Sequence, residues 1–478
     1  MGFLRAEKNL LTATIRGSAP VSRMQQIRLA VQLSIPAIMA QISSIIMQYI
    51  DASMVGSLGA DASASIGLVT TSTWIFMGLC SAAAVGFSVQ VAHQIGSGNG
   101  EEARSIFRQG LTTTMLFSLV LMIIGLSISR SLPQWLGGNP DINPAATLYF
   151  QVFMVSMPVI QYSFLASGML RCSGNMVFPG MAGVVGCVLD VVFNFFLIFP
   201  SRTIHPLGMD VWIPGAGMGV YGAAIGTMAS EAVIVVAMLL KLIYGSGELK
   251  LHHSPGSFKP RKNCLRKAYK IAMPMGIERL LTSGAQVMLT IIVAPLGTFA
   301  IAANAFAITA ESLCYMPGYG IADAATTLVG QSVGAGRKQL ARQFAYTCVG
   351  MGMVVMTVLG VVMYIAAPVI IGLMTPVSQI VDLGVMALRT EAWAEPMYAA
   401  SIVAYGAFVG AGDTLMPCCL NLGSMWGVRI TLAAILAPIY GLHGVWIAMC
   451  VELCFRGAIF LWRLKTPYWQ NRIDKLKA

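Results

Sequence analysis

The stretch QIGSGNGEEAR at residues 94–104 returns in related form as SVGAGRKQLAR at residues 332–342, which lies 238 positions further along the chain. Gly96, Gly98, Ala103 and Arg104 recur within it as Gly334, Gly336, Ala341 and Arg342. More landmarks recur at the same offset: Pro36, Leu58, Gly59, Pro158, Ala166, Gly168, Gly174 and Pro179 return as Pro274, Leu296, Gly297, Pro396, Ala404, Gly406, Gly412 and Pro417. An offset that stays constant over so long a stretch indicates two copies of one unit.

The composition is that of a membrane protein. Hydrophobic residues make up 56% of the 478 residues and charged residues only 10%, whereas soluble domains carry about 25% charged residues. Apolar stretches long enough to cross a ~30 Å hydrocarbon layer lie at residues 30–57, 63–95, 106–131, 146–171, 177–199, 218–244, 268–293, 300–333, 341–373, 380–411, 416–438 and 441–464. We therefore predict an all-α membrane protein with twelve transmembrane helices, six in each copy. Duplication in so apolar a chain points to a transporter.

The basic residues indicate the orientation. They gather before the first span, after the second and eighth spans, in the central loop and at the end of the chain, while the intervening loops hold little beyond Arg130 and Arg202. By the positive-inside bias, both termini are expected in the cytoplasm. This alternation argues against a nucleic-acid partner despite the net charge of +11. Because six spans is an even number, the two copies share one orientation, and we expect a pseudo-twofold axis along the membrane normal.

These features divide the chain into five predicted parts. They are a cytoplasmic N-terminal segment (1–28), an N-lobe with helices 1–6 (29–244), a polar linker (245–266), a C-lobe with helices 7–12 (267–465) and a cytoplasmic tail (466–478). Pro36 and Pro274 occupy equivalent places in the first helix of each lobe, where a proline removes a backbone hydrogen bond. We expect both to be hinges. We also expect a monomer in the cytoplasmic (inner) membrane, in contact with the lipid bilayer.

Ionisable side chains within spans are costly and often functional. In the N-lobe, Asp51 and Asp190 are expected at similar depth, with Asn194 on the same helix face as Asp190. Thr227 of the sixth helix lies near that depth as well. Two adjacent carboxylates either share a proton or recruit a cation, and oxygen ligands suit Na⁺. The alternative is a structural role, in which each acid satisfies a neighbouring polar group.

The C-lobe carries more charge. Candidates for coupling or substrate binding are Glu278, Glu311, Glu391 and Glu395. Glu278 could instead form an ion pair with an arginine of the same lobe. Glu391 and Glu395 would repel each other unless Arg389, Arg429 or a proton neutralises them. Glu452 and Arg456 are spaced as a helical ion pair and are expected to be structural.

Ordered motifs give the chain a family resemblance. Pro36 with Asp51 and Gly56, the helix endings 94–98 and 328–336, and the segment 410–414 together resemble the multidrug and toxic compound extrusion (MATE) family. The resemblance implies a V-shaped pair of six-helix lobes that exports organic compounds as Na⁺ or H⁺ moves inward. It also implies an N-lobe cation site, which Asp51, Asp190, Asn194 and Thr227 match. The order of Asn and Asp on the fifth helix is reversed here, which leaves the choice of ion open.

The sequence thus predicts a secondary active antiporter that exports organic, often cationic and amphipathic compounds in exchange for H⁺ or Na⁺. No cofactor is expected, and no metal beyond a possible Na⁺ at the four N-lobe residues. The alternative within the superfamily is a flippase for lipid-linked oligosaccharide. An intramembrane enzyme is disfavoured because the five histidines lie at helix ends or in loops, away from any acid-base constellation at membrane depth.

Overall fold

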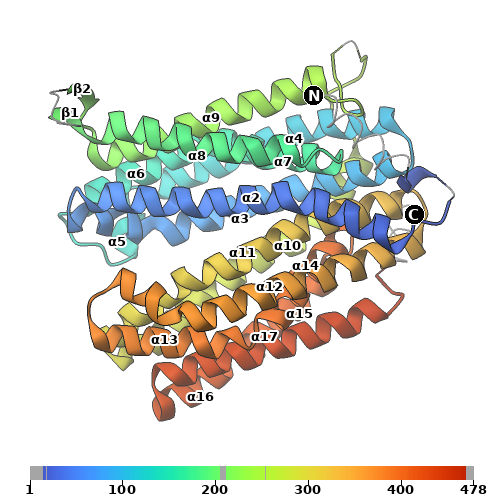
Figure 1. The fold of residues 1–478 in the computed structure, drawn as a ribbon. Coiled ribbons are helices and arrows are strands. Elements are labelled where there is room, and N and C mark those ends of the chain that lie inside the picture. The colour runs from blue at the N-terminus through green and yellow to red at the C-terminus, as the bar shows by residue number, and fades with distance from the viewer. Residues whose placement is uncertain (1–13, 18, 205–210, 253, 470–478) are drawn as a thin grey trace.

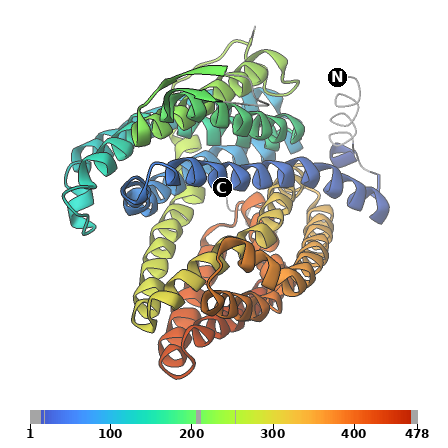
Figure 2. The ribbon, with the colours of Figure 1, turned by 60° about the vertical axis from the view of Figure 1, so that its left-hand side comes forward.

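The computed structural model describes residues 14–17, 19–204, 211–252 and 254–469. The helices of the first half of the chain (blue to green) and of the second half (yellow to red) form two bundles that lie side by side (Figure 1). Half of the predicted N-terminal segment (residues 1–13 and 18) and most of the predicted tail (residues 470–478) fall outside the described residues. The bundles meet where α2 packs against α11 and α3 packs against α10, and α2 can be followed across this boundary in Figure 2.

The helices follow one another in the order that the hydropathy pattern predicts. The N-lobe contains α2 (Arg23–Gly56), α3 (Ala60–Gly96), α4 (Gly100–Ile128), α5 (Leu132–Trp135), α6 (Asn143–Val155), α7 (Met157–Cys172), α8 (Val177–Ile198) and α9 (Gly219–Gly245). The C-lobe contains α10 (Lys262–Val293), the 3₁₀ turn η2 (Ala294–Leu296), α11 (Thr298–Gly334), α12 (Lys338–Met374), α13 (Ser378–Ala392), α14 (Glu395–Gly410), α15 (Leu415–Ser424), the π-helical η3 (Met425–Ile430), α16 (Thr431–Tyr440) and α17 (Leu442–Lys465).

Among the described residues, ten helices are long and apolar enough to cross a membrane, and the bent pair α6–α7 makes an eleventh span. The predicted span 380–411 is present as α13 and α14, which are 15 and 16 residues long. Each is shorter than the roughly 20 residues that a single span needs. They are separated by Trp393 and Ala394, so the described residues give ten or eleven candidate spans where the sequence predicted twelve.

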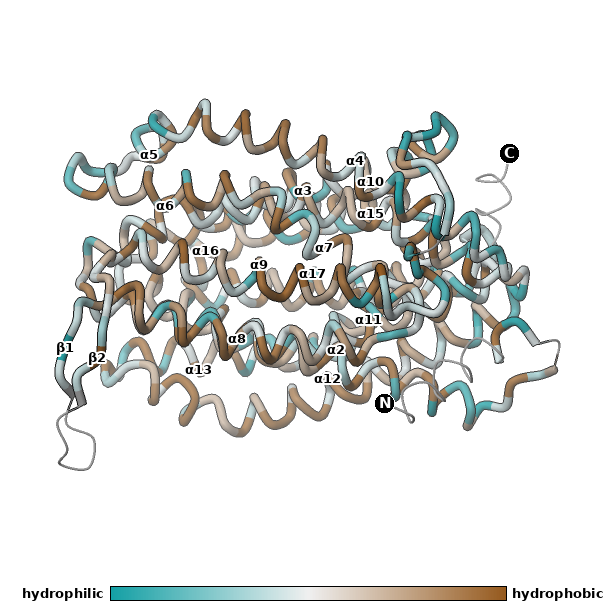
Figure 3. Tube along the Cα trace, turned by 90° about the horizontal axis from the view of Figure 1, so that it is seen from above, coloured by the Kyte–Doolittle hydropathy of each residue, from teal (hydrophilic) through white to brown (hydrophobic). Residues whose placement is uncertain are grey.

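Some helices are longer than their apolar stretches. Helix α2 begins at Arg23, where Ser22 and Gln25 form a capping box, and α10 begins at Lys262. Both starts are earlier than the sequence predicted, because the first turns of these helices are polar and hydropathy detects only the apolar part. Polar colour at the end of the bundle that carries the C-terminus shows this in Figure 3. A two-stranded hairpin at the opposite end, β1 (Pro200–Ile204) with β2 (Val211–Ala216), was not predicted.

The repeated glycines end equivalent helices in the same way. Gly98 and Gly336 have φ of 81° and 75°, a left-handed conformation that glycine adopts without strain. The next amide in each case donates back across the helix end, Asn99 to the Gln94 carbonyl at 2.9 Å and Arg337 to the Ser332 carbonyl at 2.9 Å. The repeated glycines therefore cap equivalent helices in the two lobes.

Candidate functional site

In the N-lobe, two carboxylates accept hydrogen bonds from one side-chain amide. Asn194 of α8 donates through Nδ2 to Oδ1 of Asp51 on α2 at 2.9 Å and to Oδ2 of Asp190 at 3.1 Å. Asp190 and Asn194 are fully buried, and Asp51 is half-buried. Helices α2 and α8 pack closely along their length. The predicted grouping of Asp51, Asp190 and Asn194 in space is thus present.

The fourth predicted residue contributes differently. The hydroxyl of Ser230, three residues after Thr227 on α9, donates to the Thr227 carbonyl at 2.8 Å and lies 3.5 Å from Oδ1 of Asp190. Within the described residues, the hydroxyl that lies beside the Asp190 carboxylate is therefore that of Ser230 rather than that of Thr227. Sequence reasoning missed Ser230, although residues three apart on a helix share a face.

Glycine makes room for the amide of Asn194. A Cβ added at Gly226 of α9 would lie 2.1 Å from Oδ1 of Asn194. That oxygen is buried and has no hydrogen-bond partner among the described residues. Asn194 therefore turns its amide nitrogen to the two carboxylates and its amide oxygen to Gly226, where only a residue without a side chain leaves room for it.

In the C-lobe, Glu278 of α10 is held by neutral groups. Tyr405 of α14 donates its hydroxyl to Oε2 at 2.5 Å, and Asn421 of α15 donates Nδ2 to Oε1 at 2.7 Å. The carboxyl is mostly buried, with 9% of its residue exposed. Among the described residues, the alternative ion pair with an arginine of the same lobe is absent.

Glu311, Glu391 and Glu395 form a second acidic group at the break between α13 and α14. Glu391 and Glu395 are fully buried, and Glu311 of α11 is 6% exposed. None of the four carboxyl oxygens of Glu391 and Glu395 has a hydrogen-bond partner in the described part of the chain. Burial of an unpaired carboxylate is costly, so such groups are expected to be neutralised by a proton or a cation.

Arg389 and Arg429, the two arginines suggested as partners of Glu391 and Glu395, bind other groups. Arg389 donates to the Tyr364 carbonyl at 3.3 Å and lies 5.2 Å from the centre of the Tyr364 ring. Arg429, on the π-helical turn η3, binds Glu452 of α17 at 2.7 Å. Among the described residues, neither arginine forms a salt bridge to Glu391 or Glu395.

The carboxylate of Glu452 accepts hydrogen bonds from three side chains. Arg456 binds it at 3.1 Å across one helical turn, as the spacing predicted. The Ser424 hydroxyl donates to it at 2.6 Å, and Arg429 completes the cluster. Loss of one partner in a buried charge cluster of this kind is strongly destabilising. This group therefore ties α17 to α15 and η3, as expected for a structural role.

The lobes are joined at the C-terminal end of α7 by contacts with α11 that the sequence did not reveal. Arg171 of α7 pairs with Asp323 of α11. One turn further, Thr327 donates to the Arg171 carbonyl at 3.3 Å, and Gln331 donates to the Cys172 carbonyl at 2.7 Å. Three side chains at intervals of four residues thus place one face of α11 on the end of α7.

The backbones of α3 and α11 cross close by. A Cβ added at Gly96 would lie 2.0 Å from the Gln331 carbonyl oxygen, and one added at Gly334 would lie 2.1 Å from the His93 carbonyl oxygen. Nε2 of His93 contacts the Gly410 carbonyl at 2.8 Å. The repeated glycines therefore have two roles. Gly98 and Gly336 cap the helices, and Gly96 and Gly334 allow the backbones of the two lobes to approach each other.

The predicted hinges lie within unbroken helices. Pro36 is inside α2 and Pro274 is buried inside α10. The Pro36 carbonyl oxygen would lie 2.6 Å from a Cβ added at Gly180 of α8, so the first proline packs against the helix that carries Asp190 and Asn194. Hinge motion at either proline stays a prediction.

Comparison with known proteins decides the family. The MatE family model matches residues 36–196 and again residues 274–435, so it finds the unit twice and at the offset of the internal repeat. The chain belongs to the MatE family. Among its relatives are proteins named probable multidrug resistance protein NorM from Thermotoga maritima (24% identical, covering 92% of this chain and 93% of the relative) and from Brucella suis (25% identical, covering 94% of each).

Solved structures of MATE proteins share the fold. A MATE protein in the straight conformation aligns with a TM-score of 0.84 at 21% identity and covers 98% of both chains. A transporter of the MOP superfamily from Pyrococcus furiosus aligns with a TM-score of 0.83 at 21% identity, again over 98% of both chains. The MatE chain is accordingly a multi-pass integral membrane protein with the MATE fold, and its family is one of transporters rather than enzymes. Within the described residues, no group of three His, Cys, Asp or Glu side chains could hold a metal ion.

Proposed function

We propose that this MatE protein is a secondary active antiporter of the cytoplasmic membrane, which exports bulky organic cations in exchange for H⁺ or Na⁺. The observation that carries the proposal is the buried cluster of Asp51, Asp190 and Asn194 in the N-lobe. Ionisable groups inside transmembrane helices mark ion pathways and proton relays. Two carboxylates on one amide can hold a proton or a cation and release it when the lobe rearranges.

The reversed order of Asp190 and Asn194 does not separate the two carboxylates, since both accept from the same nitrogen. With the amide turned over, Oδ1 of Asn194 would face Asp51 and Asp190, and three oxygens would surround one position. This arrangement suits Na⁺, which prefers oxygen ligands, whereas the orientation with Nδ2 between the carboxylates suits neutralisation by a proton. We propose that the same residues serve whichever ion drives transport.

The C-lobe offers a place for an organic cation. Glu311, Glu391 and Glu395 are buried, and the rings of Tyr315 and Tyr398 lie 5.6 Å apart in the same lobe. Acids among aromatic rings favour organic cations. The name multidrug resistance protein, given to NorM relatives, supports this substrate class. The fold alone does not fix it, because a MOP superfamily transporter of this fold is described as having a binding pocket of reverse polarity that suggests a different function.

Transport by purified protein tests the proposal. In inside-out vesicles reconstituted with this chain, uptake of ethidium, an organic cation, is expected when an outward-directed gradient of H⁺ or of Na⁺ is imposed, one at a time. A response to one gradient identifies the coupling ion. The proposal is wrong if neither gradient drives ethidium or a panel of other organic cations while the protein remains folded.

Substitution at Gly226 tests whether the geometry of the N-lobe cluster matters. Gly226→Ala places a Cβ 2.1 Å from the Asn194 amide oxygen, so the amide must leave Asp51 and Asp190. We expect ion-driven transport to fall by roughly tenfold or more, which corresponds to about 1.4 kcal/mol of lost ion binding. Gly183→Ala on α8 is the matched control, because its Cβ meets atoms of Ala40 at an ordinary 3.6 Å. Equal transport by both variants would count against the cluster.

A further inference from the structure

A cavity of about 520 Å³ lies at the cytoplasmic end of the boundary between the lobes. Its walls come from both lobes: Gln90, His93 and Gln94 of α3 and Glu102 of α4 face the start of α10, and Gly334 of α11 closes one side. Nothing in the proposed transport cycle uses this space. Its volume falls within the range of about 300–1,000 Å³ that is typical of small-molecule sites.

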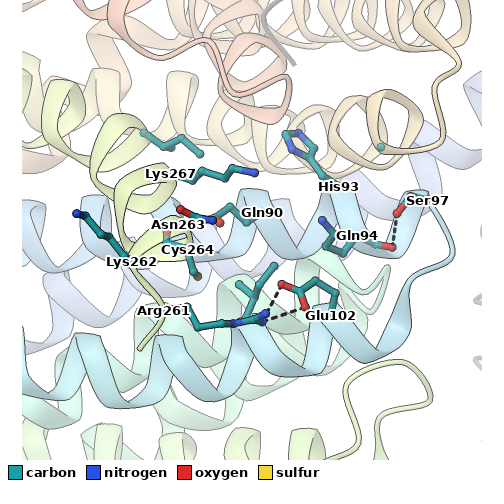
Figure 4. A pocket seen from close by; sticks show the side chains of 13 residues that line it. Gln90, His93, Gln94, Ser97, Glu102, Arg261, Lys262, Asn263, Cys264 and Lys267 are labelled. Carbon is teal, nitrogen blue, oxygen red and sulfur yellow. Dashed lines mark hydrogen bonds and ion pairs between the residues drawn. The ribbon is translucent and has the colours of Figure 1, made fainter. Parts of the chain in front are cut away.

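The lining is basic on the α10 side. Arg261, Lys262 and Lys267 contribute three positive charges, and Glu102 is the one acidic lining residue. Glu102 is bound to Arg261 at 2.8 Å, whereas Lys262 and Lys267 have no ion pair among the described residues. In Figure 4, Lys267 extends past Gln90 toward His93, while the amine of Lys262 points away from the other labelled side chains. Lys267 is therefore the cation best placed to meet an occupant.

Helix α10 adds to this positive field. Its first residues, Lys262, Asn263 and Cys264, line the cavity, and the first amide to bond back to the N-cap carbonyl is that of Leu265. The N-cap, Arg261, supplies no side-chain acceptor, and the first turn holds no acid. The neighbouring helix α4 differs, because Asn99 caps it and two acids lie in its first turn. Amides at a helix start attract anions.

The remaining walls suit a group with a polar head and an apolar neighbour. Gln94 and Asn263 offer hydrogen-bond donors, and Ile106 and Ile271 provide buried apolar surface. Asn263, Gln90 and Gln94 lie between Lys267 and the Arg261–Glu102 pair in Figure 4. A phosphate group carries the charge and the acceptor oxygens that these donors require.

We propose that this cavity binds a phosphate-bearing anion between Lys267, Arg261 and the start of α10. The phosphate is supplied either by the headgroup of an anionic phospholipid or by a soluble phosphate ester. Because the walls belong to both lobes, the occupant favours the arrangement in which the cytoplasmic ends of the lobes are together. A ligand that binds one arrangement more tightly shifts the population toward it.

Two probes distinguish the sources. Binding of phosphatidylglycerol to the detergent-solubilised full-length protein is measured by native mass spectrometry, with phosphatidylcholine as the neutral lipid. Binding of radiolabelled glycerol 3-phosphate is measured by equilibrium dialysis at constant ionic strength. The wild type is expected to bind at least one of the two phosphate probes, and the one that binds identifies the source.

Variants on one helix locate the site. Lys267→Gln is expected to weaken binding by about tenfold or more, and Lys267→Arg to retain it. Lys270→Gln, which removes an exposed charge three residues away and outside the lining, should change binding by less than about twofold. The proposal is overturned if neither probe binds, or if Lys267→Gln and Lys270→Gln weaken binding equally, since that result would reflect the general basic charge of this face.

Discussion

Asp51→Asn is expected to abolish ion-driven export while leaving the protein folded. Asparagine has nearly the same shape as aspartate, and its side-chain oxygen can still accept from Asn194, which donates to Asp51 at 2.9 Å. The substitution therefore removes the charge and keeps the packing. Without that charge, Asp190 has no carboxylate neighbour in this cluster, and the pair can no longer share a proton or hold a cation.

Resistance to ethidium in an efflux-deficient host, measured together with the amount of protein in the membrane, checks this expectation. Resistance should fall to the level of the empty vector at normal expression. Asp61→Asn is the matched control, because Asp61 is an exposed residue in the first turn of α3, in the same lobe. Unchanged resistance in the Asp51 variant would show that the cluster is structural.

The sequence predicted the scaffold well because its signals are local. Apolar length marks each span, and paired glycines mark equivalent helix ends, as the matching φ angles of Gly98 and Gly336 show. The features it missed depend on polar ends or on tertiary packing. The early starts of α2 and α10 lie in polar sequence, and the break at Trp393–Ala394 falls inside a stretch that reads as continuous.

The same contrast between local signals and tertiary packing applies to the candidate site residues. Asp190 and Asn194 share a face because of helix geometry, and depth along the helix was enough to suggest Asp51 as their neighbour. Tyr405 and Asn421, which hold Glu278, could not be found in this way, since their position depends on how α14 and α15 are rotated against α10. The Arg171–Asp323 pair was hidden for a similar reason, because its members belong to different lobes.

The contact between lobes leads to a second strong prediction, at Gly96. If the lobes rock about their boundary, the cytoplasmic ends must separate and rejoin in each cycle, and Gly96 and Gly334 are where the two backbones touch. Gly96→Ala places a methyl group 2.0 Å from a backbone oxygen of Gln331. That oxygen cannot swing aside as a flexible side chain would, so the closed arrangement is destabilised by about 1–3 kcal/mol.

A cost of this size would shift the population of the closed arrangement by roughly 5- to 150-fold, and transport should fall accordingly. The shift is measurable as a longer distance between spin labels at Glu101 and Gln339, which are exposed, repeat-related positions at the starts of α4 and α12. Gly67→Ala on the same helix is the control, because its added Cβ has no atom within 4 Å. If Gly96→Ala transports normally and the label distance is unchanged, the crossing of α3 and α11 is not a moving contact. If the distance grows while Arg171 and Asp323 remain intact, the close approach of the backbones, rather than the ion pair, is what keeps the cytoplasmic side shut.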